Sequence, residues 1–127
     1  MARRSRTTPV VAELTAPVRN RILGLRQVKA SELAPHPANW RRHPEWQKSA
    51  LQGLLSEVGW ATALIAYRAG DGRLTLLDGH LRRETAGDEI VPVLELDVTD
   101  AEALKLLATL DPLAMAAETD FAAYRTL

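Results

Sequence analysis

The 127-residue sequence predicts a single α+β domain. Apolar runs of strand length alternate with segments whose apolar residues recur at helical spacing, and glycines or prolines separate them. Hydrophobic residues make up 46% of the chain, which suits one modest core. We therefore expect a small mixed sheet with flanking helices.

The chain opens with a segment that we expect to be a mobile basic arm. Residues 1–24 are rich in Arg, Thr, Pro and Ala and show little apolar periodicity, so they offer little to a core. The predicted domain follows and extends over residues 25–118. Its first element is a strand in "LRQVKASEL" (residues 25–33).

A proline-rich loop and a helix follow this strand. Three prolines within residues 35–44 forbid a helix there and favour an extended path. Pro44 suits a first helical position, and Gly59 can supply a left-handed C-terminal cap. Between them, five apolar residues fall on one face at helical spacing: Trp46, Ala50, Leu54, Leu55 and Val58.

The middle of the chain predicts three strands around a second helix. "ATALIAYR" (residues 61–68) and "RLTLL" (residues 73–77) are short strands joined by a hairpin-type connection. "GHLRRETAG" follows as a short helix closed by Gly87, and "EIVPVLELD" is the next strand. Pro92 indicates that this strand is an edge or that it starts there, because proline lacks the N–H that a sheet requires.

The C-terminal part predicts further helices. Thr99 and Glu102 have the spacing of a capping box, which opens a leucine-rich helix. The pair Asp111-Pro112 repeats a cap-then-proline signal and predicts another helix. Residues 119–127 read as the start of one more helix that stops abruptly, which is consistent with a piece of a longer protein.

The composition excludes several kinds of chemistry. The chain has no cysteine, which excludes disulfides, thiol catalysis and thiolate metal sites. Its three histidines, His36, His43 and His80, are too few and too dispersed to indicate zinc, and we expect no haem. No stretch approaches the roughly 18 apolar residues that span a bilayer, and the start lacks a secretory signal. We therefore expect a cytoplasmic protein without a membrane partner.

Charge is unevenly distributed although the formal net charge is zero. Residues 1–48 contain ten Arg or Lys and three Glu, whereas the rest contains six Arg or Lys and thirteen acidic residues. A basic arm can serve solubility alone, or it can contact phosphates. A contact of the second kind with DNA would be sensitive to salt and tolerant of sequence.

The stretch "LLDGHLRRETAG" carries the strongest functional pattern. A helix start leaves backbone N–H groups unpaired, and Gly79 allows a ligand to approach them closely. Arg82 and Arg83 add guanidiniums that match phosphate oxygens. Asp78 would repel a phosphate unless it caps the helix, holds an arginine or ligates Mg²⁺. Together with His80, these residues predict a phosphate site; the alternative is an ordinary surface helix capped by Asp78.

The loop "HPANWRRHP" offers a second polar cluster. Asn39 can donate and accept hydrogen bonds, Arg41 and Arg42 are cationic, and we place Asn39 and Arg41 with the phosphate site. Trp40 either stacks on a base or sugar or serves as a buried anchor. We expect the loop histidines to act as hydrogen-bonding groups and Trp60 to lie in the core.

The order of these motifs resembles the ParB/sulfiredoxin superfamily. A strand, "LxPHPxNxR", a helix ending in glycine, two strands, "LLDGHLRR", a helix, "VPVLELD" and a leucine-rich helix follow one another. The chain looks most like ParB N-terminal-like domains of phages and mobile elements, some of which are joined to DNA methyltransferases. The resemblance covers about residues 25–118. It implies an α+β fold whose strand-to-helix turn binds nucleotide phosphates.

The turn resembles three branches of this superfamily to different degrees. In the partition proteins it carries G-E-R-R and binds CTP with Mg²⁺; Gly79 and Arg82 match the glycine and the second arginine. His80 and Leu81 replace the glutamate and the first arginine. In sulfiredoxin a reactive cysteine stands at the position of His80, which excludes that activity here. The free-serine kinases share D-G-H-x-R and also use a carboxylate base, for which Glu32 is the candidate by position.

Two classes of function follow from these patterns. The first is a nucleotide-binding, DNA-associated module, with a homodimer or a linked methyltransferase as a further partner. The second is an enzyme, either a phosphotransferase or NTPase or a nuclease, with His80 or Glu32 as the base and Asp78 as an Mg²⁺ ligand. A protein-interaction domain without the ligand is the remaining alternative. We favour the module, because metal-dependent cleavage usually needs clustered carboxylates, which the motif lacks.

Overall fold

The computed structural model describes residues 16–115 and residue 125 of the chain. Most of the predicted basic arm and the predicted further helix from residue 119 lie outside the described residues, as do the side chains of residues 110–115. Within the described part, no helix is both long and apolar enough to cross a membrane.

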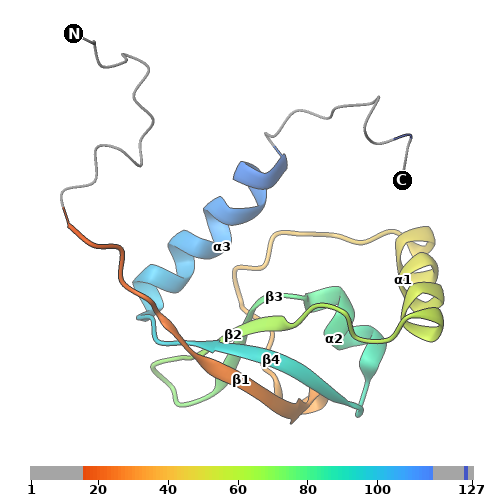
Figure 1. The fold of residues 1–127 in the computed structure, drawn as a ribbon, viewed down its shortest axis with the longest axis horizontal. Coiled ribbons are helices and arrows are strands. Elements are labelled where there is room, and N and C mark those ends of the chain that lie inside the picture. Colours follow the sequence, from red (N-terminus) through yellow and green to blue (C-terminus); the bar gives the residue numbers. More distant parts are fainter. Residues whose placement is uncertain (1–15, 116–124, 126–127) are drawn as a thin grey trace, which may run out of the picture.

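A four-stranded mixed sheet forms the centre of the domain (Figure 1). Its strands are β1 (Ile22–Lys29), β2 (Leu64–Arg68), β3 (Leu74–Asp78) and β4 (Ile90–Leu96). They lie in the order β1-β4-β2-β3, and β4 is antiparallel to β1 and parallel to β2. The antiparallel strands β2 and β3 form the predicted hairpin. The small mixed sheet expected from the sequence is thus confirmed.

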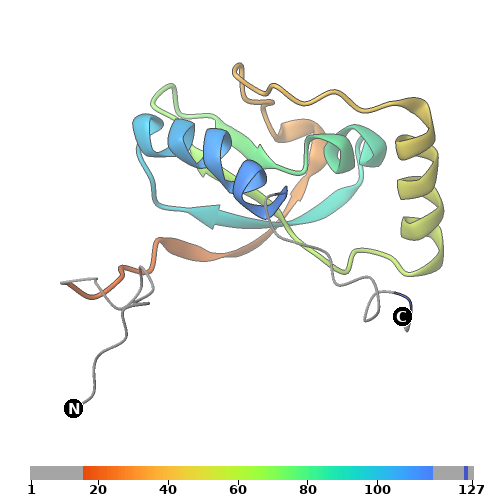
Figure 2. The same cartoon turned by 90° about the horizontal axis from the view of Figure 1, so that it is seen from above.

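Helices lie beside the sheet and connect its strands. They are the short 3₁₀ helix η2 (Ala30–Glu32), α1 (Glu45–Glu57), α2 (His80–Ala86) and α3 (Asp100–Met115). Figures 1 and 2 both show α1 next to α2 at one end of the molecule and α3 toward the other end. The proline-rich loop between η2 and α1 passes the start of α2, where the backbone of His36 bonds to His80.

The core occupies both faces of the sheet, because neighbouring residues of a strand point to opposite sides. One cluster joins β2, β3 and β4 to η2 and α2; it contains Ala30, Leu33, Leu64, Ala66, Leu74, Leu76, Ala86, Val91 and Val93. A second cluster joins the sheet to α3 and contains Tyr67, Leu77 and Ala103. Trp60 is partly buried against the first cluster, in agreement with its predicted place in the core.

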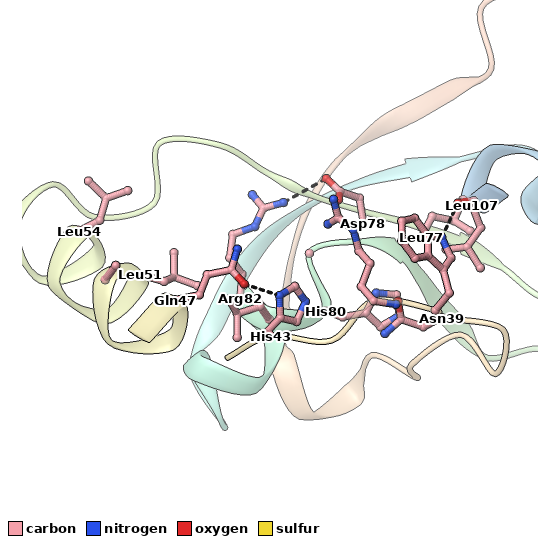
Figure 3. Close-up of a pocket in the computed structure, with 15 residues that line it drawn as sticks. Asn39, His43, Gln47, Leu51, Leu54, Leu77, Asp78, His80, Arg82 and Leu107 are labelled. Carbon is pink, nitrogen blue, oxygen red and sulfur yellow. Dashed lines mark hydrogen bonds and ion pairs between the residues drawn. The ribbon is translucent and has the colours of Figure 1, made fainter. Parts of the chain in front are cut away.

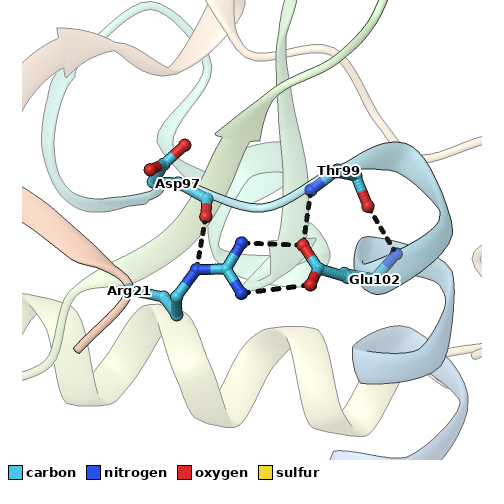
Figure 4. Close-up of polar contacts among 4 residues, drawn as sticks. All are labelled: Arg21, Asp97, Thr99 and Glu102. Atoms are coloured by element: carbon cyan, nitrogen blue, oxygen red, sulfur yellow. Dashed lines mark hydrogen bonds and ion pairs between the residues drawn. The ribbon is translucent and has the colours of Figure 1, made fainter. Parts of the chain in front are cut away.

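The domain begins before the predicted boundary. β1 starts at Ile22 and pairs with β4 from its first residue. The guanidinium of Arg21 makes two hydrogen bonds, of 2.7 and 3.0 Å, with the carboxylate of Glu102 (Figure 4). Residues 21–24 therefore belong to the domain, and this part of the predicted arm is wrong. The reason is that β4 and Glu102, which lie about 70 to 80 residues later in the chain, hold residues 21–24 in place, and the local sequence gives no sign of these partners.

The start of α3 confirms the predicted capping box. The backbone N–H of Thr99 donates to Oε1 of Glu102 over 2.9 Å, and the backbone N–H of Glu102 donates to Oγ1 of Thr99 over 3.2 Å. The helix then continues through Asp111-Pro112, so the separate helix predicted there is wrong. Proline removes one backbone hydrogen bond, and the turns on either side continue the helix.

Pro92 lies in an interior strand, so the prediction that it marks a sheet edge is wrong. β4 has β1 on one side and β2 on the other. The pairing with β2 begins only at Val93, and Pro92 therefore lies in the first part of β4, where β1 is its neighbour. A residue without an N–H is tolerated near a strand start, which was the other predicted position.

α1 has the predicted helical span, but its apolar residues are not buried. The helix follows Pro44, which is its N-cap rather than its first residue, and Gly59 after its end has a φ of +89°. No residue of α1 is buried, and Trp46, Leu54 and Val58 are among the exposed large apolar residues of the domain. α1 packs beside α2 rather than on the sheet, which leaves these side chains accessible.

Candidate functional site

The turn between β3 and α2 requires glycine at position 79. Gly79 has a φ of +102°, in the left-handed region that glycine adopts without strain. A Cβ at this position would lie 2.7 Å from Cγ of Leu64 and 3.2 Å from Nη2 of Arg82. α2 then begins with Gly79 as its N-cap and without a side-chain cap. The alternative of a surface helix capped by Asp78 is therefore wrong.

Arg82 is held over this turn by three groups. Its Nη2 donates to Oδ2 of Asp78 over 3.1 Å, and its Nη1 donates to Oγ1 of Thr62 and to the carbonyl of Ala63. Of the three roles considered for Asp78, the structure shows the one that holds an arginine. These bonds leave the Nε–H and one N–H on Nη2 available to a ligand.

His80 ties the turn to the proline-rich loop. Its side chain is buried, and Nε2 accepts a hydrogen bond of 3.1 Å from the backbone N–H of His36. An accepting Nε2 means that the neutral ring carries its proton on Nδ1. Burial is the largest cause that lowers the pKa of His80, and the nearby His36 lowers it further. His80 is therefore a neutral residue whose one ring lone pair already has a partner.

These groups line a cavity of about 340 Å³ between the proline-rich loop, α1 and the β3–α2 turn (Figure 3). Its volume falls in the range of small-molecule sites, about 300–1,000 Å³. Six of the residues that the sequence assigned to the phosphate site line it: Asn39, Arg41, Asp78, Gly79, His80 and Arg82. The structure thus brings the loop cluster and the turn cluster into one site.

The loop is held in place by local bonds and by α3. Trp40 is half-exposed rather than a buried anchor, and its Nε1 donates to the carbonyl of Leu107 over 3.4 Å. The guanidinium of Arg41 lies 5.8 Å from the centre of the Trp40 ring. His36 accepts the backbone N–H of Ala38 at Nδ1, so its predicted hydrogen-bonding role is confirmed.

No family model matches the sequence, and no curated protein matches it. Solved structures do match its fold. The chromosome-partitioning protein ParB from Caulobacter crescentus, complexed with CTP-gamma-S, superposes with a TM-score of 0.62 at 20% identity over 76% of this chain. Sulfiredoxin from Arabidopsis thaliana superposes with a TM-score of 0.54 at 14% identity over 68% of this chain and 99% of its own. The chain has the ParB/sulfiredoxin fold.

A Pnob8-like ParB-N domain matches the same ParB/sulfiredoxin fold with a TM-score of 0.53 at 21% identity over 68% of this chain. The chain spans 56% of the solved Caulobacter chain, which is itself C-terminally truncated, and 36% of the Pnob8-like chain. Identities of this order establish the fold, and the site has to be argued from its own residues.

Two residues that the sequence proposed for the site lie elsewhere in this ParB/sulfiredoxin fold. Nε of Arg83 donates to the carbonyls of Ala30 and Leu33 over 3.2 and 3.1 Å, so this arginine anchors η2 to α2. Glu32, a candidate base, is exposed on η2. Neither residue lines the cavity.

One wall of the cavity, contributed by α1 and α3, was not predicted from the sequence. Gln47, Leu51 and Leu54 line it from α1, and Leu107 lines it from α3. Gln47, Leu51 and Leu54 have the spacing i, i+4, i+7 of one helix face, which was a usable signal. Nothing in the sequence, however, indicated that this face would meet the β3–α2 turn, because that depends on how the loop directs α1.

Proposed function

We propose that this ParB/sulfiredoxin-fold domain is a nucleotide-binding module that holds phosphates over the Gly79 turn. The observation that carries the proposal is the excess of hydrogen-bond donors in the cavity. Arg82 and the neutral His80 offer N–H groups and Arg41 adds positive charge to the lining, whereas the carboxylate of Asp78 is already paired with Arg82. A negatively charged ligand that has only hydrogen-bond acceptors can pair with these N–H donors, and phosphate oxygens are such acceptors.

Two further facts support a nucleotide as the source of the phosphates. The cavity also has apolar walls from α1 and α3, which a free phosphate would leave uncovered. In addition, the Caulobacter protein with the same fold was solved with CTP-gamma-S, an analogue of a nucleoside triphosphate.

Magnesium fits the donor set of the site as a companion of the nucleotide. Mg²⁺ is usually held by one or two carboxylates together with substrate phosphates. Asp78 lines the cavity, and after its bond to Arg82 its carboxylate still has lone pairs to offer. Asp78 would hold the ion, which when bound neutralises phosphate charge, while Arg82 and Arg41 orient the phosphates.

The geometry favours binding over catalysis. A general base must present a lone pair to the proton it removes. Nε2 of His80 already accepts the N–H of His36, and Glu32 lies outside the cavity. Neither of the two candidate bases is therefore placed to support the phosphotransferase, NTPase or nuclease alternative.

We also propose that the module associates with DNA, as the resemblance to phage and mobile-element ParB-like domains suggests. The excess of Arg and Lys in residues 1–48 and the fold shared with a chromosome-partitioning protein support this role. A homodimer or a linked methyltransferase would be the further partner that couples nucleotide binding to DNA.

Thermal unfolding with ATP, ADP, CTP and GTP, each with and without Mg²⁺, tests the nucleotide site. A ligand at 100 times its dissociation constant should stabilise the wild type by about 2.7 kcal/mol. Arg82→Ala should lose this stabilisation, and Arg68→Ala, an exposed arginine on β2, should keep it. A stabilisation that Arg82→Ala retains in full would place the ligand elsewhere.

A further inference from the structure

The end of the cavity formed by α1 has a chemistry of its own. Gln47, Leu51 and Leu54 of α1 line the same cavity as Gly79, and Figure 3 shows the Gln47 side chain extending from α1 toward Arg82. Two of the three side chains are apolar, and Ala50 also lines this wall. A phosphate gains nothing from such a surface, so this end suits the other part of a nucleotide.

The apolar part of this wall is open. Leu51 is half-buried, Leu54 is exposed, and no residue of α1 is buried against the rest of the domain. A flat aromatic ring placed against these side chains would remove apolar surface from water at both partners. A nucleobase is such a ring, and a nucleotide with phosphates at Gly79 carries it into the same cavity.

Gln47 is the polar group of this wall, and His43 fixes its orientation. Nδ1 of His43 lies 2.8 Å from Oε1 of Gln47. An amide oxygen cannot donate, so the imidazole Nδ1 carries a proton and donates to it. With its oxygen engaged by His43, the side-chain amide turns its two N–H donors away from His43. Gln47 therefore presents its N–H donors to a base in the cavity, while its oxygen stays bonded to His43.

We propose that Gln47, positioned by His43, reads the base of the nucleotide and favours bases that carry a carbonyl oxygen. Cytosine, uracil and guanine present such an oxygen with two lone pairs, whereas adenine accepts only at ring nitrogens with one lone pair each. An amide recognises adenine best through a donor and an acceptor together, on N7 and N6, and the bond to His43 restrains the acceptor. This inference rests on the proposed nucleotide site and adds the residue that selects among nucleotides.

The pair has an alternative role as a structural link at the start of α1. His43 lies just before the helix and Gln47 in its first turns, so the bond between them could serve the helix end alone. In that case, loss of the pair would lower stability without changing the preference among bases. Base preference is therefore the property that separates the two roles.

Titration calorimetry of the full chain with CTP, UTP, GTP, ATP and tripolyphosphate, all with Mg²⁺, tests the inference. The wild type should bind the three nucleotides with carbonyl-bearing bases more tightly than ATP, by about 10-fold, the value of one hydrogen bond. Gln47→Leu should remove this preference and leave the affinity for tripolyphosphate unchanged. His43→Phe should reduce the preference, because the amide can then rotate to meet adenine.

Gln52→Leu is the matched control, because Gln52 is an exposed glutamine of the same helix outside this cavity. It should leave the affinities and the preference unchanged. A preference that survives in Gln47→Leu, or equal affinity of the wild type for all four nucleotides, would overturn the inference and leave the phosphate site standing. Failure of the wild type to bind even tripolyphosphate would overturn the proposed function, and the inference with it.

Discussion

Gly79 is the residue on which the geometry of the site most depends. Two independent constraints act there: the left-handed backbone, and the contact that a Cβ would make with Leu64 in the core. The second constraint cannot be relieved cheaply, because Leu64 is fully buried in β2. Any larger residue would shift the β3–α2 turn and with it the guanidinium of Arg82.

Gly79→Ala should therefore lower the free energy of unfolding by about 1–3 kcal/mol. Gly53→Ala is the control, because Gly53 lies in α1 with no atom near its Cβ direction and with a negative φ. That variant should gain up to about 1 kcal/mol from helix propensity. Urea unfolding of both variants measures the two effects, and equal stability of the two would contradict the strained turn.

His80 makes stability depend on pH. Its folded pKa is lowered from 6.5, by burial first and by His36 and His43 as well, whereas Asp78 and Glu84 act in the opposite direction. The unfolded chain therefore takes up the proton first, and stability should fall as the pH drops below about 6.5. His80→Gln should flatten this part of the profile of melting temperature against pH. An unchanged profile would mean that another group is responsible.

Individual residues differ in how far the sequence could reveal them. The glycine and the arginine of the turn act through neighbours a few positions away, so the local pattern pointed to them. The partner of His80 is a backbone N–H 44 positions earlier, which no local pattern contains. Arg82 and Arg83 are identical in type and adjacent in sequence, and only the fold decides that one faces the cavity and the other faces η2.

At the scale of elements, short-range periodicity predicted the helices and strands, whereas pairing between distant segments fixed their limits. β1 extends back to Ile22 because β4 offers a partner strand there. The link between Arg21 and Glu102 reinforces this edge of the sheet, and it lowers the pKa of Glu102 to about 2 from the usual 4.5 (Figure 4). The hydrogen bonds from Arg21 are the first cause of that shift, ahead of the backbone N–H of Thr99.

The Arg21–Glu102 link should contribute stability that depends on acidity. Because the folded pKa of Glu102 is depressed, the contribution is present above about pH 4.5 and is lost as the pH falls toward about 2. Arg21→Ala and Glu102→Gln should each lower the melting temperature at pH 7 and flatten its fall in acid. The double variant should lose less than the sum of the two, since each single change already breaks the pair. Additive losses would contradict a direct link.

At the scale of the whole molecule, the fold brings together a loop, a turn and two helices that the sequence separates. The loop and the turn were recognisable because their polar residues cluster in sequence. The walls from α1 and α3 were not recognisable from the sequence. Gln47 reaches the cavity only because of the path of the loop, and Leu107 only because α3 contacts that loop at Trp40. The phosphate end was thus accessible to sequence reasoning, and the end that we assign to the base needed the structure.

The proposed association with DNA also belongs to this scale. Removal of residues 1–20 leaves Arg21 and β1 in place, so the melting temperature should change little. The affinity for duplex DNA should fall, and its dependence on salt should become shallower, because fewer cationic groups contact phosphates. Fluorescence anisotropy between 50 and 200 mM salt, concentrations over which such contacts weaken strongly, measures both quantities. An unchanged salt dependence would assign the contact to the domain instead.

The central claim is that nucleotide phosphates lie over the Gly79 turn, and amide NMR during a titration with CTP and Mg²⁺ tests it most directly. The backbone N–H signals of Gly79 and His80 and the Nε–H of Arg82 should shift together and saturate at one concentration. The signals of Gly24 on β1 and Gly72 in the β2–β3 hairpin, which lie outside the cavity, should stay in place. Shifts confined to β1 or the hairpin, with an unchanged Gly79, would contradict the account.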